Sequence, residues 1–156
     1  MEYLLVKWVH ILSATVLFGT GIGSAFYLLT AVVSRRPAIV AHVAGWVVRA
    51  DWIFTATTAV VQPATGWWMM HLAGLPAGAG WIAWSIALYA VAMACWLPVV
   101  WLQIQMRNLA QQADAAGSAL PAAFWRCFRW WFGLGVPALA GFLAIFWLMV
   151  AKPTMG

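Results

Sequence analysis

Long apolar stretches separated by short polar connections dominate the pattern of the chain. An α-helix needs about 20 apolar residues to cross a hydrocarbon core of about 30 Å. Four stretches are long enough, and they cover approximately residues 4–33, 44–72, 81–106 and 125–151. The polar stretch at 111–120 is expected to be a loop or a frayed helix end. The pattern predicts an all-α, four-transmembrane-helix bundle that forms a single transmembrane domain over residues 1–156.

Composition supports a lipid environment. The chain is 66% hydrophobic and only 7% charged, whereas roughly a quarter of the residues in a soluble domain are charged. Such a sequence cannot cover a water-facing surface. The first apolar run, from Trp8 to Val33, is longer than the core of a signal peptide, so we interpret it as a retained first helix.

The charges predict an orientation for the bundle. The connection at residues 73–80 carries no charge, whereas arginines flank the first and third connections. These arginines are Arg35, Arg36, Arg49, Arg107, Arg126 and Arg129. The positive-inside rule places this side in the cytoplasm, so both termini should lie outside (N-out/C-out). The 13 tryptophans concentrate near the predicted ends of the spans, as expected of aromatic belts. The small basic excess is therefore a topology signal, and no nucleic-acid partner is expected.

Two histidines are the best candidates for chemistry within the spans. At 1.5 Å per residue, His10 lies about 37 Å from Arg35 along its helix, and His71 about 33 Å from Arg49. Antiparallel helices would place both imidazoles at similar depth, in a layer that includes Lys7 and Met149. Two such imidazoles can ligate a haem iron axially, and a nearby cation such as Lys7 could bind a haem propionate. Alternatively, each histidine is an interfacial side chain that binds water or lipid.

Two further polar features have both a functional and a structural interpretation. Met69 and Met70 beside His71 would suit Cu(I), although methionine is also a common packing residue. Asp51 is the only acidic residue within a predicted span, and a structural ion pair with Arg49 or another arginine is expected there. The alternative for Asp51 is a role in proton transfer or near a haem propionate.

Small residues and prolines predict where helices approach each other. Gly19 and Gly23 lie four residues apart, a spacing that favours close helix contact. Pro63, Pro98 and Pro137 fall inside predicted helices and are expected to kink them. These are ordinary membrane-helix prolines, or else the kinks open a pocket on one side.

Several classes of enzyme have no visible machinery in this sequence. It contains no glycine-rich phosphate loop, nucleophile elbow, HExxH motif or paired-cysteine motif. Cys95 and Cys127 are expected to be small apolar residues. No catalytic residue is assigned.

Several motifs resemble a bacterial superfamily of membrane proteins. The stretch Val6-Lys7-Trp8-Val9-His10-Ile11-Leu12, followed by residues 19–25, resembles the first helix of copper-resistance D proteins and of the four-helix protoporphyrinogen IX oxidase. Nearly the whole chain is similar to an uncharacterised "predicted integral membrane protein" branch. The matching motifs are 49–54 (Arg-Ala-Asp-Trp-Ile-Phe), 62–66 (Gln-Pro-Ala-Thr-Gly), 95–103 (Cys-Trp-Leu-Pro-Val-Val-Trp-Leu-Gln) and 148–153 (Leu-Met-Val-Ala-Lys-Pro).

The resemblance implies a haem b ligand at His10, within the Lys-x-x-His motif, and a bacterial inner-membrane location. The oxidases also use a lysine on their third helix, and this chain has none between Lys7 and Lys152, which argues against the same reaction. We therefore expect a small b-type haem protein in electron transfer, with quinone as a possible partner. The alternatives are a non-catalytic accessory or assembly subunit of a larger membrane complex, and a copper-handling membrane protein.

Overall fold

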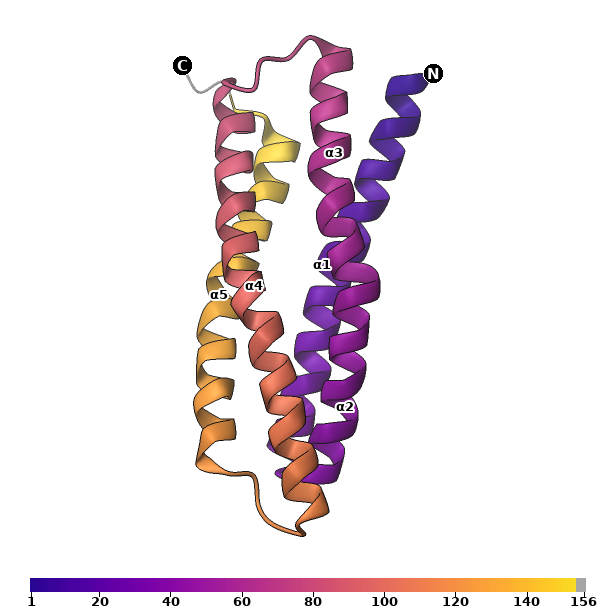
Figure 1. The fold of residues 1–156 in the computed structure, drawn as a ribbon. Helices are drawn as coiled ribbons and strands as arrows, with labels where there is room; N and C mark the ends of the chain where they lie inside the picture. Colours follow the sequence, from indigo (N-terminus) through magenta and orange to yellow (C-terminus); the bar gives the residue numbers. More distant parts are fainter. Residues whose placement is uncertain (154–156) are drawn as a thin grey trace.

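The chain forms a bundle of long helices, shown in Figure 1 as a computed structural model that describes residues 1–153. The elements in chain order are α1 (Glu2–Val33), α2 (Pro37–Ala50), the short π-helix η1 (Asp51–Thr55), α3 (Ala56–Ala73), α4 (Gly80–Ala115) and α5 (Ala122–Ala151). Because α2, η1 and α3 run on without a break, the described chain has four helices long and apolar enough to cross a membrane. The predicted all-α bundle of four spans is confirmed.

The helices are longer than the apolar stretches that predict them. The second span begins at Pro37 rather than near residue 44, and α4 continues to Ala115 rather than ending near residue 106. A span of 36 residues is about 54 Å long, well beyond the hydrocarbon core. Pro37 suits the first position of a helix because proline has no N–H to lose there. Gly74 ends α3 in the left-handed conformation, with a φ of 63°.

The bundle consists of two hairpins, α1 with α2–η1–α3 and α4 with α5. The hairpins join mainly through α2 and α4. The start of α1 and the end of α5 lie at one end of the bundle, and the other end carries the turn at residues 34–36 and the connection at residues 116–121 (Figure 1). We call this second end the arginine end. Its largest fully buried side chains are Leu28, Val40, Met106 and Phe124, so the dense core lies there. In contrast, α3 buries only Thr58 among its residues.

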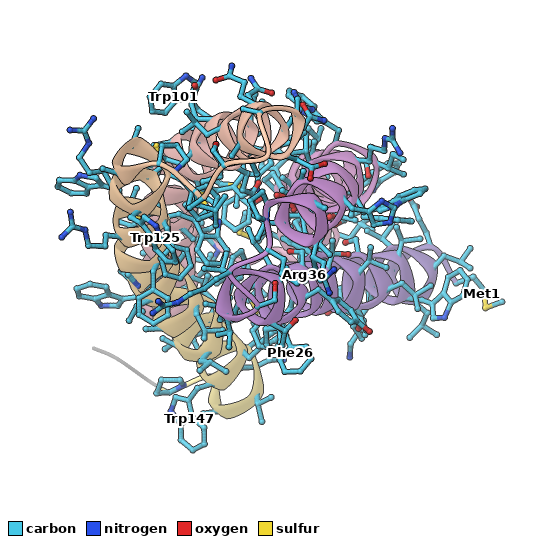
Figure 2. All side chains as sticks on the ribbon, turned by 90° about the horizontal axis from the view of Figure 1, so that it is seen from below. Met1, Phe26, Arg36, Trp101, Trp125 and Trp147 are labelled. Carbon is cyan, nitrogen blue, oxygen red and sulfur yellow. The ribbon has the colours of Figure 1, made fainter. Side chains whose placement is uncertain are left out.

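The outer surface of the bundle is apolar. Large hydrophobic side chains are exposed along every span, among them Phe26 (61%), Trp101 (59%) and Trp147 (69%). Figure 2, a view along the bundle, shows these three side chains pointing away from its centre. Such a surface is unfavourable in water but favourable in lipid, because acyl chains are as apolar as leucine.

Prolines lie inside three of the helices, as predicted: Pro63 in α3, Pro98 in α4 and Pro137 in α5. Both α4 and α5 change direction about halfway along their length (Figure 1). Pro63 cannot donate to the carbonyl of Ala59 one turn earlier. The Tyr89 hydroxyl of α4 donates to that oxygen at 2.6 Å, so the freed carbonyl joins the two hairpins.

Candidate functional site

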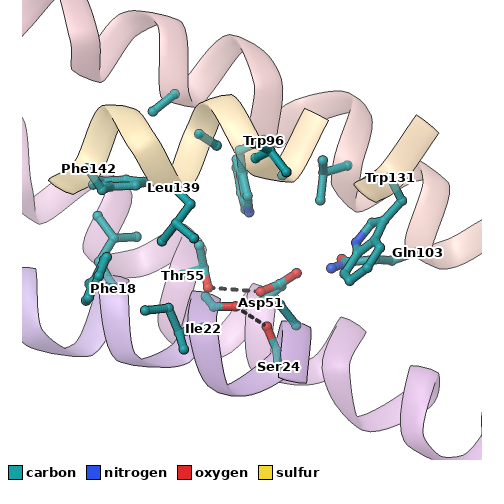
Figure 3. A pocket seen from close by; sticks show the side chains of 18 of the residues that line it. Phe18, Ile22, Ser24, Asp51, Thr55, Trp96, Gln103, Trp131, Leu139 and Phe142 are labelled. Carbon is teal, nitrogen blue, oxygen red and sulfur yellow. Dashed lines mark hydrogen bonds between the residues drawn. The ribbon is translucent and has the colours of Figure 1, made fainter. Parts of the chain in front are cut away.

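A cavity of about 360 Å³ lies between the hairpins, next to the dense core (Figure 3). Its walls come from α1, η1, α4 and α5. The walls include Val99, Val136 and Ala138, which are neighbours of Pro98 and Pro137 in the chain. The cavity therefore lies at the level of two helix kinks, in agreement with the interpretation that kinks open a pocket.

The cavity reaches the lipid-facing surface between α1 and α5. Ile22 and Phe26 of α1 line it and are 44% and 61% exposed. On the α5 side, Val136 and Leu139 line it and are 53% and 42% exposed. Residues that are both cavity wall and outer surface form a rim. A lipid-soluble molecule could enter through this rim directly from the bilayer.

The π-helix η1 places a polar pair on the cavity wall. Asp51 and Thr55 are only 3% and 4% exposed, and the Thr55 hydroxyl donates to Asp51 Oδ1 at 3.0 Å. A π-helix is wider than an α-helix and is common at functional sites. Here it lies at the centre of the second span, with Asp51 at its first residue.

Three buried polar atoms on the same wall have no partner among the described residues. They are the indole nitrogens of Trp96 and Trp131 and the side-chain oxygen Oε1 of Gln103. The Gln103 side chain is directed toward the Asp51 carboxyl in the same space (Figure 3). Figure 3 shows these side chains around one space. Leaving a buried polar group unpaired costs about 1–3 kcal/mol, and lipid offers no compensation.

The predicted ion pair between Arg49 and Asp51 is not among the contacts of the described residues. The Arg49 guanidinium is exposed and stands 4.8 Å from the centre of the Trp46 ring. The Asp51 carboxyl instead accepts a hydrogen bond from Thr55. Two residues apart on a helix, the Arg49 and Asp51 side chains point in different directions.

The structure gives His10 partners on α3. His10 Nδ1 lies 2.8 Å from Thr65 Oγ1, and the Gln62 amide lies at the same distance once its oxygen and nitrogen are exchanged. A Cβ atom built on Gly66 would be 3.4 Å from His10 Cε1. Gln62, Thr65 and Gly66 share one face of α3 because they are three and four residues apart. This contact fixes α1 against α3.

His71 does not share that face. At about 100° per residue, its position is turned by about 120° or more from Thr65 and Gly66, and it lies about 9 Å beyond Thr65 along the axis. Its ring is exposed and stacks on Trp67 at 6.1 Å between ring centres. His10 and His71 therefore do not converge, and this arrangement does not fit a haem held between them.

The other residues proposed for that layer are dispersed over the surface. Lys7 is exposed one turn before His10 on α1, and Met149 of α5 is 36% exposed. Within residues 1–153, no hydrogen bond or ion pair joins either of them to the His10 cluster of Gln62, Thr65 and Gly66. A haem at His10 would therefore depend on one protein ligand and on no propionate partner placed beside it by this fold.

Sequence patterns alone do not identify most of the cavity residues. Trp131 is expected at the inner membrane interface, but it is only 5% exposed and faces the cavity. From sequence, Gln103 is predicted only to form a hydrogen bond between helices, as other glutamines in the spans could. The sequence does contain one signal: Trp96 and Gln103 are seven residues apart, so they lie on the same face of α4.

Comparison with protein families gives one match. The family described as "Predicted integral membrane protein (DUF2269)" matches residues 4–153. No curated protein and no solved structure matches the chain. The family description gives the membrane location in general terms and names no ligand.

Proposed function

The chain belongs to this family of predicted integral membrane proteins, and from that premise we propose that it binds a lipid-soluble quinone in the cavity between its hairpins. In this proposal the protein presents the quinone to an electron-transfer partner in the membrane. Such a role also suits a subunit of a larger membrane complex. The volume, about 360 Å³, lies within the range of about 300–1,000 Å³ typical of small-molecule sites.

One observation carries the proposal: the unpartnered buried polar atoms all line a cavity that opens toward lipid. The two indole nitrogens of Trp96 and Trp131 can only donate hydrogen bonds. A quinone is a flat ring with carbonyl oxygens that accept them. Its isoprenoid tail would leave through the rim between Ile22 and Leu139, where the wall is apolar. Phe18 and Phe142 supply further aromatic wall for the ring.

The test uses the full chain, purified in mild detergent and reconstituted into lipid nanodiscs. Quinones retained through purification are extracted and identified by chromatography, and binding of a short-tailed benzoquinone is measured by equilibrium partition against empty nanodiscs. Trp96→Phe and Trp131→Phe keep an aromatic ring and remove one donor each. We expect each to weaken binding about fivefold, because one hydrogen bond is worth about 1 kcal/mol.

Trp101→Phe is the matched control, because Trp101 is on α4 but is 59% exposed and does not line the cavity. It should bind as the native protein does. Partition no greater than into empty nanodiscs, or equal affinity in all four proteins, would contradict the proposal. Such a result would favour a non-catalytic accessory subunit.

The same preparation also tests the haem and copper interpretations. Haem ligation would here rest on His10, whose Nδ1 is engaged by α3, so that Nε2 would be the ligating atom. A Soret band that is lost in His10→Ala would support haem at His10, and its absence with added haemin would remove that interpretation. Metal analysis of protein purified from cells grown with copper tests whether Met69, Met70 and His71 bind copper.

A further inference from the structure

The polar groups around the cavity differ in what they can offer a ligand. The indoles of Trp96 and Trp131 offer donors, whereas Gln103 offers the acceptor Oε1. The donor of Thr55 is already committed, since its hydroxyl donates to Asp51. Within residues 1–153, the fully buried cavity atoms without partners are therefore two donors and one neutral acceptor.

The Gln103 side chain is directed toward the Asp51 carboxyl (Figure 3). Because a carboxylate accepts hydrogen bonds, it favours the orientation in which the Gln103 amide nitrogen is on the Asp51 side. The oxygen Oε1 is then left without a partner among the described residues. Gln103 is only 3% exposed, and a reversed amide would turn its nitrogen away from the carboxylate and lose that interaction.

The two redox forms of a quinone satisfy this set of groups differently. The oxidised form has only acceptor oxygens, so it can pair with the indole N–H groups but leaves Gln103 Oε1 unpaired. The reduced quinol has hydroxyl groups, each of which accepts one hydrogen bond and donates another. A quinol can therefore accept from an indole and donate to Gln103. Sites built to bond a ligand hydroxyl discriminate strongly against analogues that lack it.

We infer that the cavity selects the reduced, dihydroxy form of its ligand, and that Gln103 Oε1 accepts a hydrogen bond from a ligand hydroxyl. This inference rests on the proposed quinone site. Gln103 acts as a specificity-determining residue, and Asp51 acts as a positioning residue that holds the Gln103 amide in the accepting orientation. By linkage, tighter binding of the reduced form also makes the bound quinone easier to reduce than the free one.

The experiment compares the dissociation constants of a short-tailed benzoquinol and its benzoquinone in nanodiscs under anaerobic conditions. We expect the native protein to bind the quinol about fivefold more tightly, the equivalent of one additional hydrogen bond. Gln103→Leu should remove the preference by weakening quinol binding alone. Gln105→Leu is the matched control, because Gln105 is on the same helix but does not line the cavity.

Asp51→Asn provides a second and more specific test. The amide nitrogen of the new side chain would donate to Gln103 Oε1, which favours the reversed amide with the Gln103 nitrogen toward the ligand. The site would then offer an additional donor in place of an acceptor. We expect the preference to reverse, so that the quinone binds more tightly than the quinol.

The outcomes separate the two proposals. Failure of both redox forms to bind the native protein would overturn the quinone site itself. The selection of the reduced form would be overturned if the native protein bound both forms equally, or if the preference for quinol persisted in both Gln103→Leu and Asp51→Asn. Either result would leave the proposed quinone site intact. Trp96→Phe should weaken the binding of quinone and quinol by the same factor, so the ratio of their dissociation constants should not change. A change in that ratio would also contradict the role of Gln103 in selecting the reduced form.

Discussion

Gly66 shows how one small residue fixes the approach of two helices. Its Cα faces the His10 ring, and a Cβ atom there would stand 3.4 Å from His10 Cε1. Larger side chains at this position must displace the imidazole, whose Nδ1 is held by Thr65. The sequence spacing instead favours Gly19 and Gly23, but a Cβ atom on either would meet no atom of another helix within 4 Å among the described residues. The prediction that they make helix contacts within this chain is wrong.

Substitution of Gly66 by leucine should therefore destabilise the protein, and substitution of Gly19 should not. Overpacking typically costs about 1–3 kcal/mol, so we expect Gly66→Leu to lower the free energy of unfolding by that amount. Gly19→Leu is the control, since Gly19 is exposed on α1. Equilibrium unfolding of the reconstituted protein in sodium dodecyl sulfate would measure both. Equal stability of the two variants would show that α1 and α3 are not closely packed at His10.

Some residues of the candidate site can be predicted from sequence, and others cannot. Asp51 is identifiable from sequence because a carboxyl group within a span is rare and costly. Its partners are not, because composition does not reveal how each helix is rotated about its axis. Arg49 is near in sequence and yet points elsewhere, while Gln103 comes from another hairpin, 52 positions further along the chain (103 less 51). The same limit applies to His10 and His71: His71 is turned away from the face of α3 that His10 contacts, and it also lies about 9 Å beyond Thr65 along the axis.

Among the described elements, the second span combines a π-helix with a proline. It contains the π-helix η1 and, eight residues after Thr55, Pro63. The existence of this span is predictable from its hydropathy, but the π-helix is not, since the residues Asp51–Thr55 carry no distinctive local pattern. Pro63 is predictable as a kink. Its consequence, a carbonyl of Ala59 that bonds to Tyr89, depends on the neighbouring hairpin.

The hydrogen bond from Tyr89 to Ala59 can be tested by a double-mutant cycle. Tyr89→Phe removes the donor and should cost about 0.6 kcal/mol, the average for interhelical hydrogen bonds in membranes, and at most about 1.7 kcal/mol. In a Pro63→Ala background the new N–H at residue 63 can bond the Ala59 carbonyl itself. Tyr89→Phe should then cost less in that background, as measured by unfolding in sodium dodecyl sulfate. An identical cost in both backgrounds would mean that Pro63 does not create the interhelical bond.

Across the whole molecule, packing is uneven from end to end. The arginine end holds the fully buried side chains, among them Leu28, Met106 and Phe124, whereas α3 at the other end is mostly exposed. The cavity adjoins the dense core, which can hold polar groups such as Gln103 in fixed orientations while the rim stays open to lipid. A rigid wall beside a lipid-facing opening is the arrangement that a hydrogen-bonding site for a membrane-soluble ligand requires.

The orientation of the bundle is the remaining property that charge predicts. Arg35 and Arg36 lie in the turn at the arginine end, and Arg126 and Arg129 lie in the first turns of α5 at the same end. The connection at residues 74–79 at the other end has no charged residue. By the positive-inside rule we expect the arginine end to be cytoplasmic and both termini to be outside. In a bacterial host, alkaline phosphatase fused to the C-terminus should therefore be active and a fluorescent protein fused there should be dark. Arginines added within residues 76–79, together with alanines at Arg35, Arg36, Arg126 and Arg129, should reverse this pattern. An active phosphatase in both versions would mean that features other than these charges set the orientation. An inactive phosphatase in the native chain would contradict the predicted N-out/C-out orientation.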